Sequence, residues 1–189
     1  MLSQLRPALI LFVLLTLITG IAYPFAMTGG AQLLSPAKAN GSLVIENGVV
    51  RGSELIGQGF SQDKYFWPRI SAAGNGYDAA ASSGANLGPT SKKLLDRIAA
   101  DAARVKAADG VSTLPPDAVT ASGSGLDPDI SPAYALVQVG RVAKARNIAE
   151  DNVKALVEAQ AKRPMLGVFG EPRVNVFALN RALDALPPG

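Results

Sequence analysis

The chain of 189 residues contains no cysteine and no histidine. This absence excludes disulfides, zinc sites built from Cys or His, cysteine nucleophiles and histidine general bases. Charged residues make up only 17% of the chain, and the net charge is +3. A charge this small, without a run of Lys or Arg, gives no indication of nucleic-acid binding. The function must therefore rest on other residue types or on a non-catalytic role.

Apolar residues make up 48% of the chain, and the surplus is concentrated near the N-terminus. Residues 9–26, LILFVLLTLITGIAYPFA, carry no charge, and about 18 residues just suffice to span a bilayer core as a helix. Tyr23 suits the membrane interface, and Pro24 is expected to loosen the last turn. Thr19 and Gly20 are suited to helix packing in lipid. The sequence therefore predicts an N-terminal transmembrane anchor over residues 1–28.

A cleaved signal peptide is the competing interpretation of this segment. Ala37-Lys38-Ala39 resembles a cleavage tripeptide, but it lies far beyond the apolar run, and a signal core is only about 7–15 residues. We therefore favour a retained anchor. Arg6 precedes the span, and the next basic residue is Lys38, so the positive-inside rule places the N-terminus in the cytoplasm and the bulk of the chain outside.

The remainder is expected to be a linker over 29–39 and one extracytoplasmic α+β domain over 40–189. Two apolar runs around Asn47-Gly48 predict a β-hairpin over 43–51. Residues 54–60 and 65–67 are expected to add short strands or edge segments. The Gly/Ala/Ser-rich segment 72–89 predicts a long loop.

Helical spacing of apolar residues predicts three to four helices, which begin and end as follows: from Thr90 or Ser91 to Asp109, from Ser131 to Asn147, over 150–161 and over 175–186. Ser131 is expected to cap the second of these, with Pro132 in its first position. Its inward stripe is expected to contain Leu136, Val139 and Ala143. Arg141, Lys144 and Arg146 form a basic edge, which is expected to be solvated.

The stretch VTASGSGLDPDISP, residues 119–132, has the glycines of a phosphate-binding loop but lacks the lysine of a Walker A motif. Asp127 and Asp129 would compete with an anion for the start of the following helix. The same oxygens resemble the start of a calcium loop, but its glycine and distal glutamate are missing. We interpret the stretch as a connector whose aspartates stabilise the start of the helix.

Ser61-Gln62-Asp63-Lys64 matches the Ser-x-x-Lys nucleophile motif of penicillin-recognising enzymes, although the companion motifs are absent. A membrane-anchored periplasmic enzyme with a Ser-Lys mechanism is therefore the alternative function. It would require Ser61 and Lys64 in a pocket with an oxyanion hole.

An ordered set of segments resembles a known family over nearly the whole chain. The segments are LRPA (5–8), TGIAYP (19–24), ANGS (39–42), GSELIGQGF (52–60), GANLGPTS (84–91), VTASGSGLDPDISP (119–132), QVGRVAKARN (138–147) and VNVFALNRALD (174–184). In this order they resemble the C subunit of the Kdp potassium-transporting P-type ATPase.

The resemblance implies a non-catalytic subunit of the bacterial inner membrane that binds no cofactor directly and is surrounded by membrane lipid. Its implied partners are the potassium-conducting A subunit, the ATP-hydrolysing B subunit and the small F subunit. Potassium and ATP are handled by the A and B subunits. It implies a role in stabilising the assembly, and a role as a catalytic chaperone that raises the ATP affinity of the B subunit.

The resemblance also implies a nucleotide contact that is similar to the signature loop of ABC transporters. That contact would fall in Ser122, Gly123, Ser124 and Gly125. Residues expected to have structural or interface roles are Thr19, Gly20, Tyr23, Pro24, Asn86, Asp127, Ser131, Pro132 and Arg141.

Overall fold

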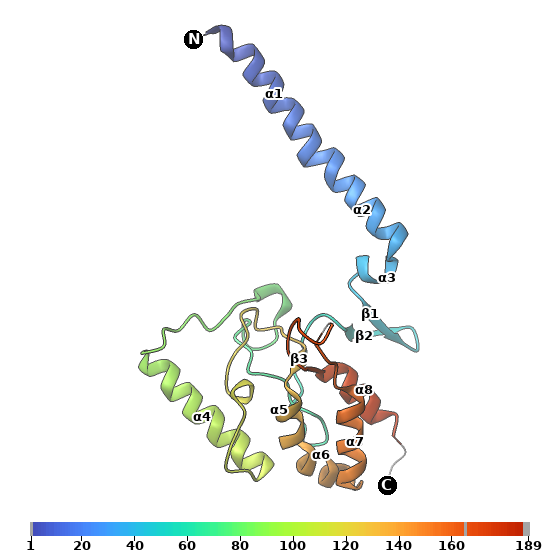
Figure 1. Cartoon of the computed structure of the whole chain (residues 1–189). Coiled ribbons are helices and arrows are strands. Elements are labelled where there is room, and N and C mark those ends of the chain that lie inside the picture. The colour runs from blue at the N-terminus through green and yellow to red at the C-terminus, as the bar shows by residue number, and fades with distance from the viewer. Residues whose placement is uncertain (1, 165, 187–189) are drawn as a thin grey trace. The chain divides into compact units, whose positions relative to one another are not determined.

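The computed structural model describes residues 2–164 and 166–186, which form two compact units (Figure 1). The first unit ends at Ser53 and the second begins at Glu54. A long apolar helix followed by a mixed domain with small two-stranded sheets confirms the predicted α+β class. The hairpin after residue 40 groups with the N-terminal helix rather than with the larger unit.

One continuous helix dominates the first unit. After η1 (Leu2–Gln4) it consists of α1 (Leu5–Leu17), a π-helical turn η2 (Ile18–Ala22) and α2 (Tyr23–Leu34). These 30 residues from Leu5 are long and apolar enough to cross a membrane, and none of the most apolar window is buried. The apolar side chains of this helix therefore require cover that the chain itself does not supply.

Pro24 lies inside this helix instead of loosening its end, which corrects the prediction. Its ring crowds the carbonyl four residues earlier, that of Gly20, and it has no N–H to donate. The π-helical turn directly precedes it, with the N–H of Tyr23 bonded to the carbonyl of Ile18. A wider turn accommodates the ring without breaking the helix.

The segment predicted as a linker, 29–39, is helical over most of its length, because α2 runs to Leu34 and α3 (Pro36–Ala39) follows. Gln32 and Asn40 exchange two side-chain hydrogen bonds, of 3.1 and 3.2 Å. This amide pair ties the end of α3 to the last turn of α2.

The predicted hairpin is confirmed. Strands β1 (Leu43–Glu46) and β2 (Val49–Ser53) pair antiparallel. Asn47 and Gly48 both have positive φ, 52° and 77°, as a type I′ turn requires.

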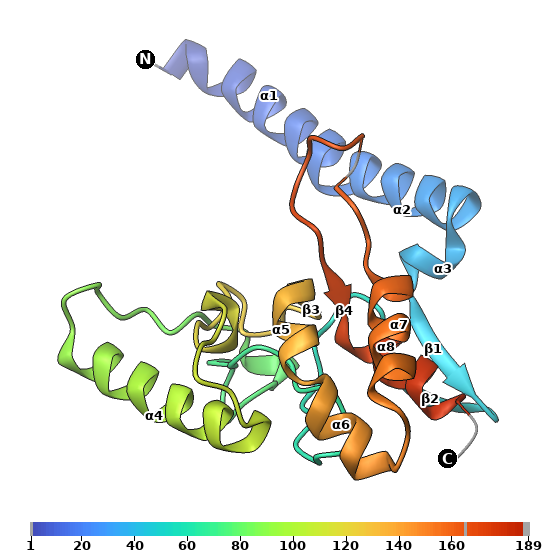
Figure 2. The ribbon, with the colours of Figure 1, turned by 60° about the horizontal axis from the view of Figure 1, so that its bottom comes forward.

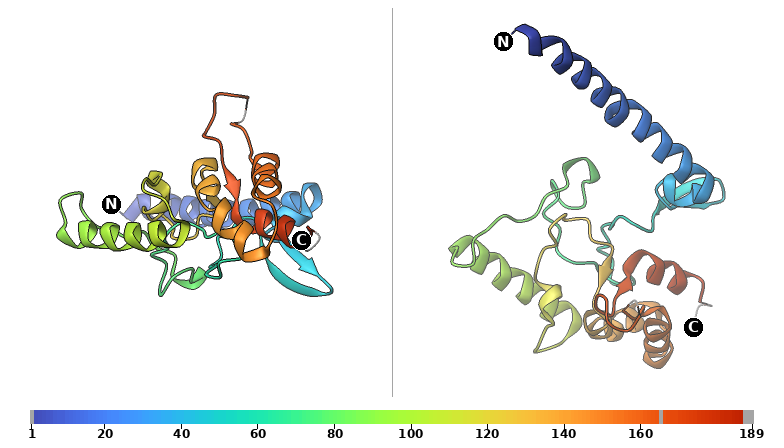
Figure 3. Two further views of the ribbon diagram at one scale, coloured as in Figure 1. Left: turned by 90° about the horizontal axis from the view of Figure 1, so that it is seen from below. Right: turned by 45° about the horizontal axis from the view of Figure 1, so that its top comes forward.

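The second unit has its helices and strands in the order η3 (Ala79–Ala81), α4 (Lys92–Asp109), η4 (Pro116–Ala118), β3 (Asp129–Ile130), α5 (Pro132–Val137), α6 (Val139–Arg146), α7 (Glu150–Gln160), β4 (Val174–Asn175) and α8 (Val176–Asp184). Strands β3 and β4 pair antiparallel, and α7 contacts α5, α6 and α8 (Figures 2 and 3). The four predicted helices are present, with the second interrupted at Gln138.

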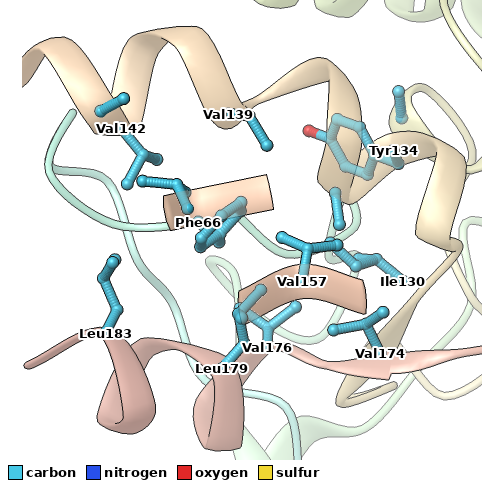
Figure 4. Packing of buried hydrophobic residues seen from close by; sticks show 14 of the residues in the cluster. Phe66, Ile130, Tyr134, Val139, Val142, Val157, Val174, Val176, Leu179 and Leu183 are labelled. Atoms are coloured by element: carbon cyan, nitrogen blue, oxygen red, sulfur yellow. The ribbon is translucent and has the colours of Figure 1, made fainter. Parts of the chain in front are cut away.

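The core of this unit lies between α5–α8 and the segment around Phe66 (Figure 4). Its largest fully buried apolar side chains are Tyr134, Phe66, Leu179 and Leu183. Val139 and Ala143 are buried as predicted, but Leu136 is exposed, which corrects the predicted stripe of the second helix. Ala135 is buried in its place, because the first turn packs with a different face.

Residues 65–67 form no strand, contrary to the expectation. Instead, two buried side-chain amides bind the backbone there, an arrangement we call the amide clamp. Asn180 accepts from the N–H of Phe66 at 2.8 Å and donates to its carbonyl at 3.0 Å. Gln138 does the same for Trp67, at 2.6 and 3.0 Å. The clamp satisfies backbone groups that a sheet would otherwise pair.

Candidate functional site: the connector loop and its cleft

The connector loop, residues 122–131, is held in shape by its own side chains. The N–H of Gly125 donates to Ser122 Oγ at 2.9 Å, and the N–H of Leu126 donates to Ser124 Oγ at 3.1 Å. Asp127 Oδ1 accepts from the N–H of Asp129 at 3.0 Å. Short polar side chains form such local bonds readily, which is why this composition gives an ordered turn.

Three earlier segments converge on the carbonyls of this loop. Ser83 N–H and Ser82 Oγ both donate to the carbonyl of Ser124, at 3.0 and 2.9 Å. Ser71 Oγ donates to the carbonyl of Gly125 at 2.6 Å. The N–H of Gly57 donates to the carbonyl of Leu126 at 2.7 Å. The loop thus joins segments around residues 57, 71 and 83 that lack secondary structure of their own.

The two aspartates of the loop pair with arginines. Asp127 binds Arg69 at 2.9 Å, and Asp129 binds Arg173 at 3.0 Å. Burial raises the pKa of the Asp129 carboxyl, the charge of Asp127 adds to the rise, and Arg173 opposes it. The two carboxylates are thus engaged with arginines, and their effect on the start of the following helix stays a prediction.

Asp117, which the sequence analysis did not single out, binds the start of α5 directly. Ser131 caps α5 as predicted, its Oγ accepting from the N–H of Tyr134 at 3.0 Å, with Pro132 in the first turn. Asp117 accepts from the N–H of Ser131 at 2.7 Å and from its Oγ at 2.9 Å. The cap is thus fixed by a carboxylate from the preceding 3₁₀ turn, η4.

A cleft of about 540 Å³ lies beside the connector loop, lined in part by Arg69, Asp117, Asp127, Asp129 and Arg173. Its charges are largely engaged with one another, and no histidine or cysteine exists to act as base or nucleophile. Across residues 2–164 and 166–186, no group of three or more Asp, Glu, His or Cys residues is arranged to hold a metal ion. The cleft thus combines paired charges with an apolar part that includes Pro115, Ile130 and Pro172.

Asn86 lies in the long loop with a φ of 48°, and it lines a second cleft of about 360 Å³ together with Arg97 and Ser122. Two members of the loop that the resemblance links to nucleotide, Gly123 and Ser124, are exposed, whereas Gly125 is buried. Thr19, Gly20, Tyr23 and Pro24 lie on the apolar helix of the first unit.

Arg141 is buried, which corrects the expectation of a solvated basic edge. It pairs with Asp109 at 2.7 Å, donates to Gln138 at 2.6 Å, and its guanidinium carbon lies 4.0 Å from the centre of the Trp67 ring. Burial raises the pKa of the Asp109 carboxyl despite the opposing effect of Arg141. Sequence reasoning missed Asp109 because it meets Arg141 across 32 residues, and it missed Gln138 because the bond of Gln138 to Trp67 spans 71 residues.

Ser61 and Lys64 do not form the site that a Ser-Lys enzyme needs. Both side chains are exposed, and the Lys64 amino group lies 5.2 Å from the centre of the Tyr65 ring. The four-residue match is therefore a surface turn.

Comparisons with known proteins agree with this picture. The family described as KdpC, the c chain of the K⁺-transporting ATPase, matches residues 5–185. The potassium-transporting ATPase KdpC subunit of Caulobacter vibrioides is 56% identical over 189 residues, which cover 100% of this chain and 96% of the relative. The KdpC subunit of Rhodopseudomonas palustris strain BisB5 is 54% identical, with 98% of each chain covered. That of Bradyrhizobium diazoefficiens is 53% identical, with 97% and 98% covered.

The helix Leu5–Leu34 is long and apolar enough to cross a membrane, as a membrane subunit requires. The family match over residues 5–185 and relatives above 50% identity over the full length leave one conclusion. The chain belongs to the KdpC family, and it is a membrane-associated, non-catalytic subunit of the Kdp potassium-transporting ATPase complex.

Proposed function

We propose that this subunit is an assembly brace that holds an ordered domain on the outer side of the plasma membrane. The observation that supports this most is the apolar helix Leu5–Leu34, whose most apolar window has no buried residue among those that the structure describes. Lipid and the transmembrane helices of other subunits are the natural cover for such a helix. Arg6 at its start favours an N-terminus in the cytoplasm and an extracytoplasmic second unit.

Its partners in this proposal are the potassium-conducting subunit, which the external domain contacts, the ATP-hydrolysing subunit and the small F subunit. In this proposal the domain provides a surface that contacts other subunits, and it catalyses no reaction. The buried amides of the clamp are engaged within the fold, which suits a rigid body that positions other subunits.

We propose further that the connector loop binds no nucleotide. A phosphate cradle needs free backbone N–H groups, but those of Gly125 and Leu126 donate to Ser122 and Ser124 within the loop. Asp127 directly follows, and its carboxylate would repel a phosphate. ATP and potassium are then handled by partner subunits, and no cofactor binds this chain.

Co-purification tests the brace. The full chain, tagged and expressed with the other Kdp subunits, should come out of detergent with them in a constant ratio. Omitting it should lower the yield of the complex formed by the remaining subunits. Recovery of the tagged chain alone would contradict the proposal.

ATP titration of the purified full chain tests the connector loop. Binding should be no tighter than millimolar, and Ser124→Ala should leave the ATP affinity of the assembled complex unchanged. Micromolar binding that Ser124→Ala abolishes would instead support the catalytic-chaperone role.

A further inference from the structure

Residues 162–164 and 166–173 belong to an arm that projects from the second unit between α7 and β4 (Figures 2 and 3). Its base is closed by two backbone hydrogen bonds between Lys162 and Arg173, of 2.8 and 3.1 Å. Arg173 is also paired with Asp129, so the arm is fastened to the connector loop. A base held in this way keeps the far end of the arm away from the body of the domain.

The far end carries an apolar tip, defined here as Leu166, Val168 and Phe169. Their side chains are 83%, 79% and 62% exposed. Among the described residues of the second unit these are the most exposed large apolar side chains, and they fall within four consecutive positions. Single exposed apolar residues are ordinary, but a contiguous group marks an interaction surface.

The backbone of the tip adopts a specific turn. The N–H of Gly167 donates to the carbonyl of Pro164 at 3.0 Å. Leu166 has a φ of 55°, in the left-handed region that bulky residues rarely adopt. Gly167 and Gly170 also have positive φ. The left-handed conformation of Leu166 carries a conformational cost, and the turn leaves the apolar side chains of the tip exposed.

The charges around the tip favour a protein surface over a lipid surface. Lys162 and Arg163 lie at the base, Glu171 is two positions from Phe169, and all three are exposed. Loops and helices that enter anionic lipid are flanked by net positive charge, which Glu171 and the Arg173–Asp129 pair reduce here. An apolar centre with a rim of both charges is the usual arrangement of a protein–protein interface.

We propose that the apolar tip inserts into an apolar pocket on the external surface of another subunit of the complex, with Phe169 as the anchor. The inference rests on the proposed function, since it requires the second unit to meet a partner outside the membrane. It adds the contact itself: a protein pocket that accepts an aromatic ring and has polar groups of both signs at its rim.

Site-specific photocrosslinking in the assembled complex tests the contact. A photoreactive phenylalanine analogue would replace Phe169 in the full chain, with the same analogue at Leu95, an exposed residue of α4 in the same unit, as the matched control. We expect a crosslink to another Kdp subunit from position 169 and a much weaker one from position 95. Crosslinks only to lipid, only to a second copy of this chain, or equal from both positions would overturn the proposal.

A substitution gives the independent measurement. Phe169→Asp should weaken assembly on the order of tenfold, measured as co-purified partner per tagged chain, because interface anchors dominate binding. Leu95→Asp should leave assembly unchanged. Both chains should unfold at the wild-type temperature, since both side chains are exposed. If the wild-type chain and Phe169→Asp co-purify equally with the other subunits, the tip has no docking role, but the proposed assembly function is retained. If the wild-type chain does not co-purify with them, the proposed assembly function itself is contradicted.

Discussion

Gly125 is the residue on which the connector loop depends most directly. Its φ is 68°, and a Cβ at this position would lie 2.6 Å from the Ala73 nitrogen and 2.7 Å from the Ser83 oxygen. Both atoms belong to the backbone and cannot move aside cheaply. The close approach of three segments is possible only without a side chain here.

Gly125→Ala should therefore lower the unfolding free energy by about 2–4 kcal/mol, from left-handed strain and overpacking together. The measurement is thermal unfolding of the detergent-solubilised chain, followed by the fluorescence of Trp67, its single tryptophan. Gly123→Ala is the matched control, because nothing lies within 4 Å of its Cβ position and its φ is not positive. Equal losses in the two variants would contradict the role given to Gly125.

Asp129 provides a pH-dependent test. Burial and Asp127 raise the pKa of its carboxyl in the folded chain above 3.8. In the pH range between the unfolded and the folded pKa, the Asp129 carboxyl is therefore protonated in the folded chain and ionised in the unfolded chain. The contribution of Asp129 to stability is therefore largest below pH 3.8 and falls as pH rises through the folded pKa.

Asp129→Asn removes this titration. The unfolding free energy of the wild type minus that of the variant should decline as pH rises from 3.8, until the native carboxyl is ionised. Unfolding of both chains over a pH series measures it. A difference that stays constant, or grows with pH, would show that the pairing with Arg173 outweighs burial.

Single residues could be predicted from sequence only where their partners are local. Ser131 was predicted as a cap because a cap binds within its own first turn. The bond from Ser131 to Asp117, 14 residues earlier, could not be predicted in this way, because the two residues meet only in the folded domain. The burial of Arg141 likewise depends on Asp109, 32 residues away.

At the scale of elements, periodicity was a good guide to helices and a poor guide to the segments between them. Asn147, the predicted end of the second helix, does end α6 in a left-handed conformation, whereas the interruption at Gln138 carries no glycine or proline signal. The segment 65–67 has the composition of a strand, but the amide clamp takes the place of a partner strand. Side-chain amides that replace a ladder leave no pattern in the sequence.

Helix capping gives a paired prediction at this scale. Ser131→Ala should cost about 1 kcal/mol, because it removes the oxygen that accepts from the first turn of α5. Ala149 occupies the same position before α7, with extended backbone and no side-chain bond. Ala149→Ser should therefore stabilise by a similar amount.

Thermal unfolding of the two variants measures the change in stability that each substitution causes. Shifts of opposite sign are expected. A destabilising Ala149→Ser would mean that the start of α7 is already satisfied in another way.

At the scale of the whole molecule, we predict that residues 1–27 remain part of the mature subunit. The apolar helix continues without a break to Leu34, so the cleavage-like Ala37-Lys38-Ala39 follows a span rather than a short signal core. Intact-mass measurement of the chain extracted from membranes should give the full-length mass. A chain that begins at Gln32 or Asn40 would contradict retention.

The amide clamp also determines when this protein can acquire its structure during synthesis. Asn180 binds the backbone of Phe66 across 114 residues, and Gln138 binds that of Trp67 across 71. A ribosome releases the chain from the N-terminus onward. The backbone groups of Phe66 therefore lack their hydrogen-bond partner until Asn180, close to the C-terminus, has emerged. Nascent chains truncated before α8 lack Asn180 and should therefore stay protease-sensitive throughout the domain, whereas the complete chain should become resistant.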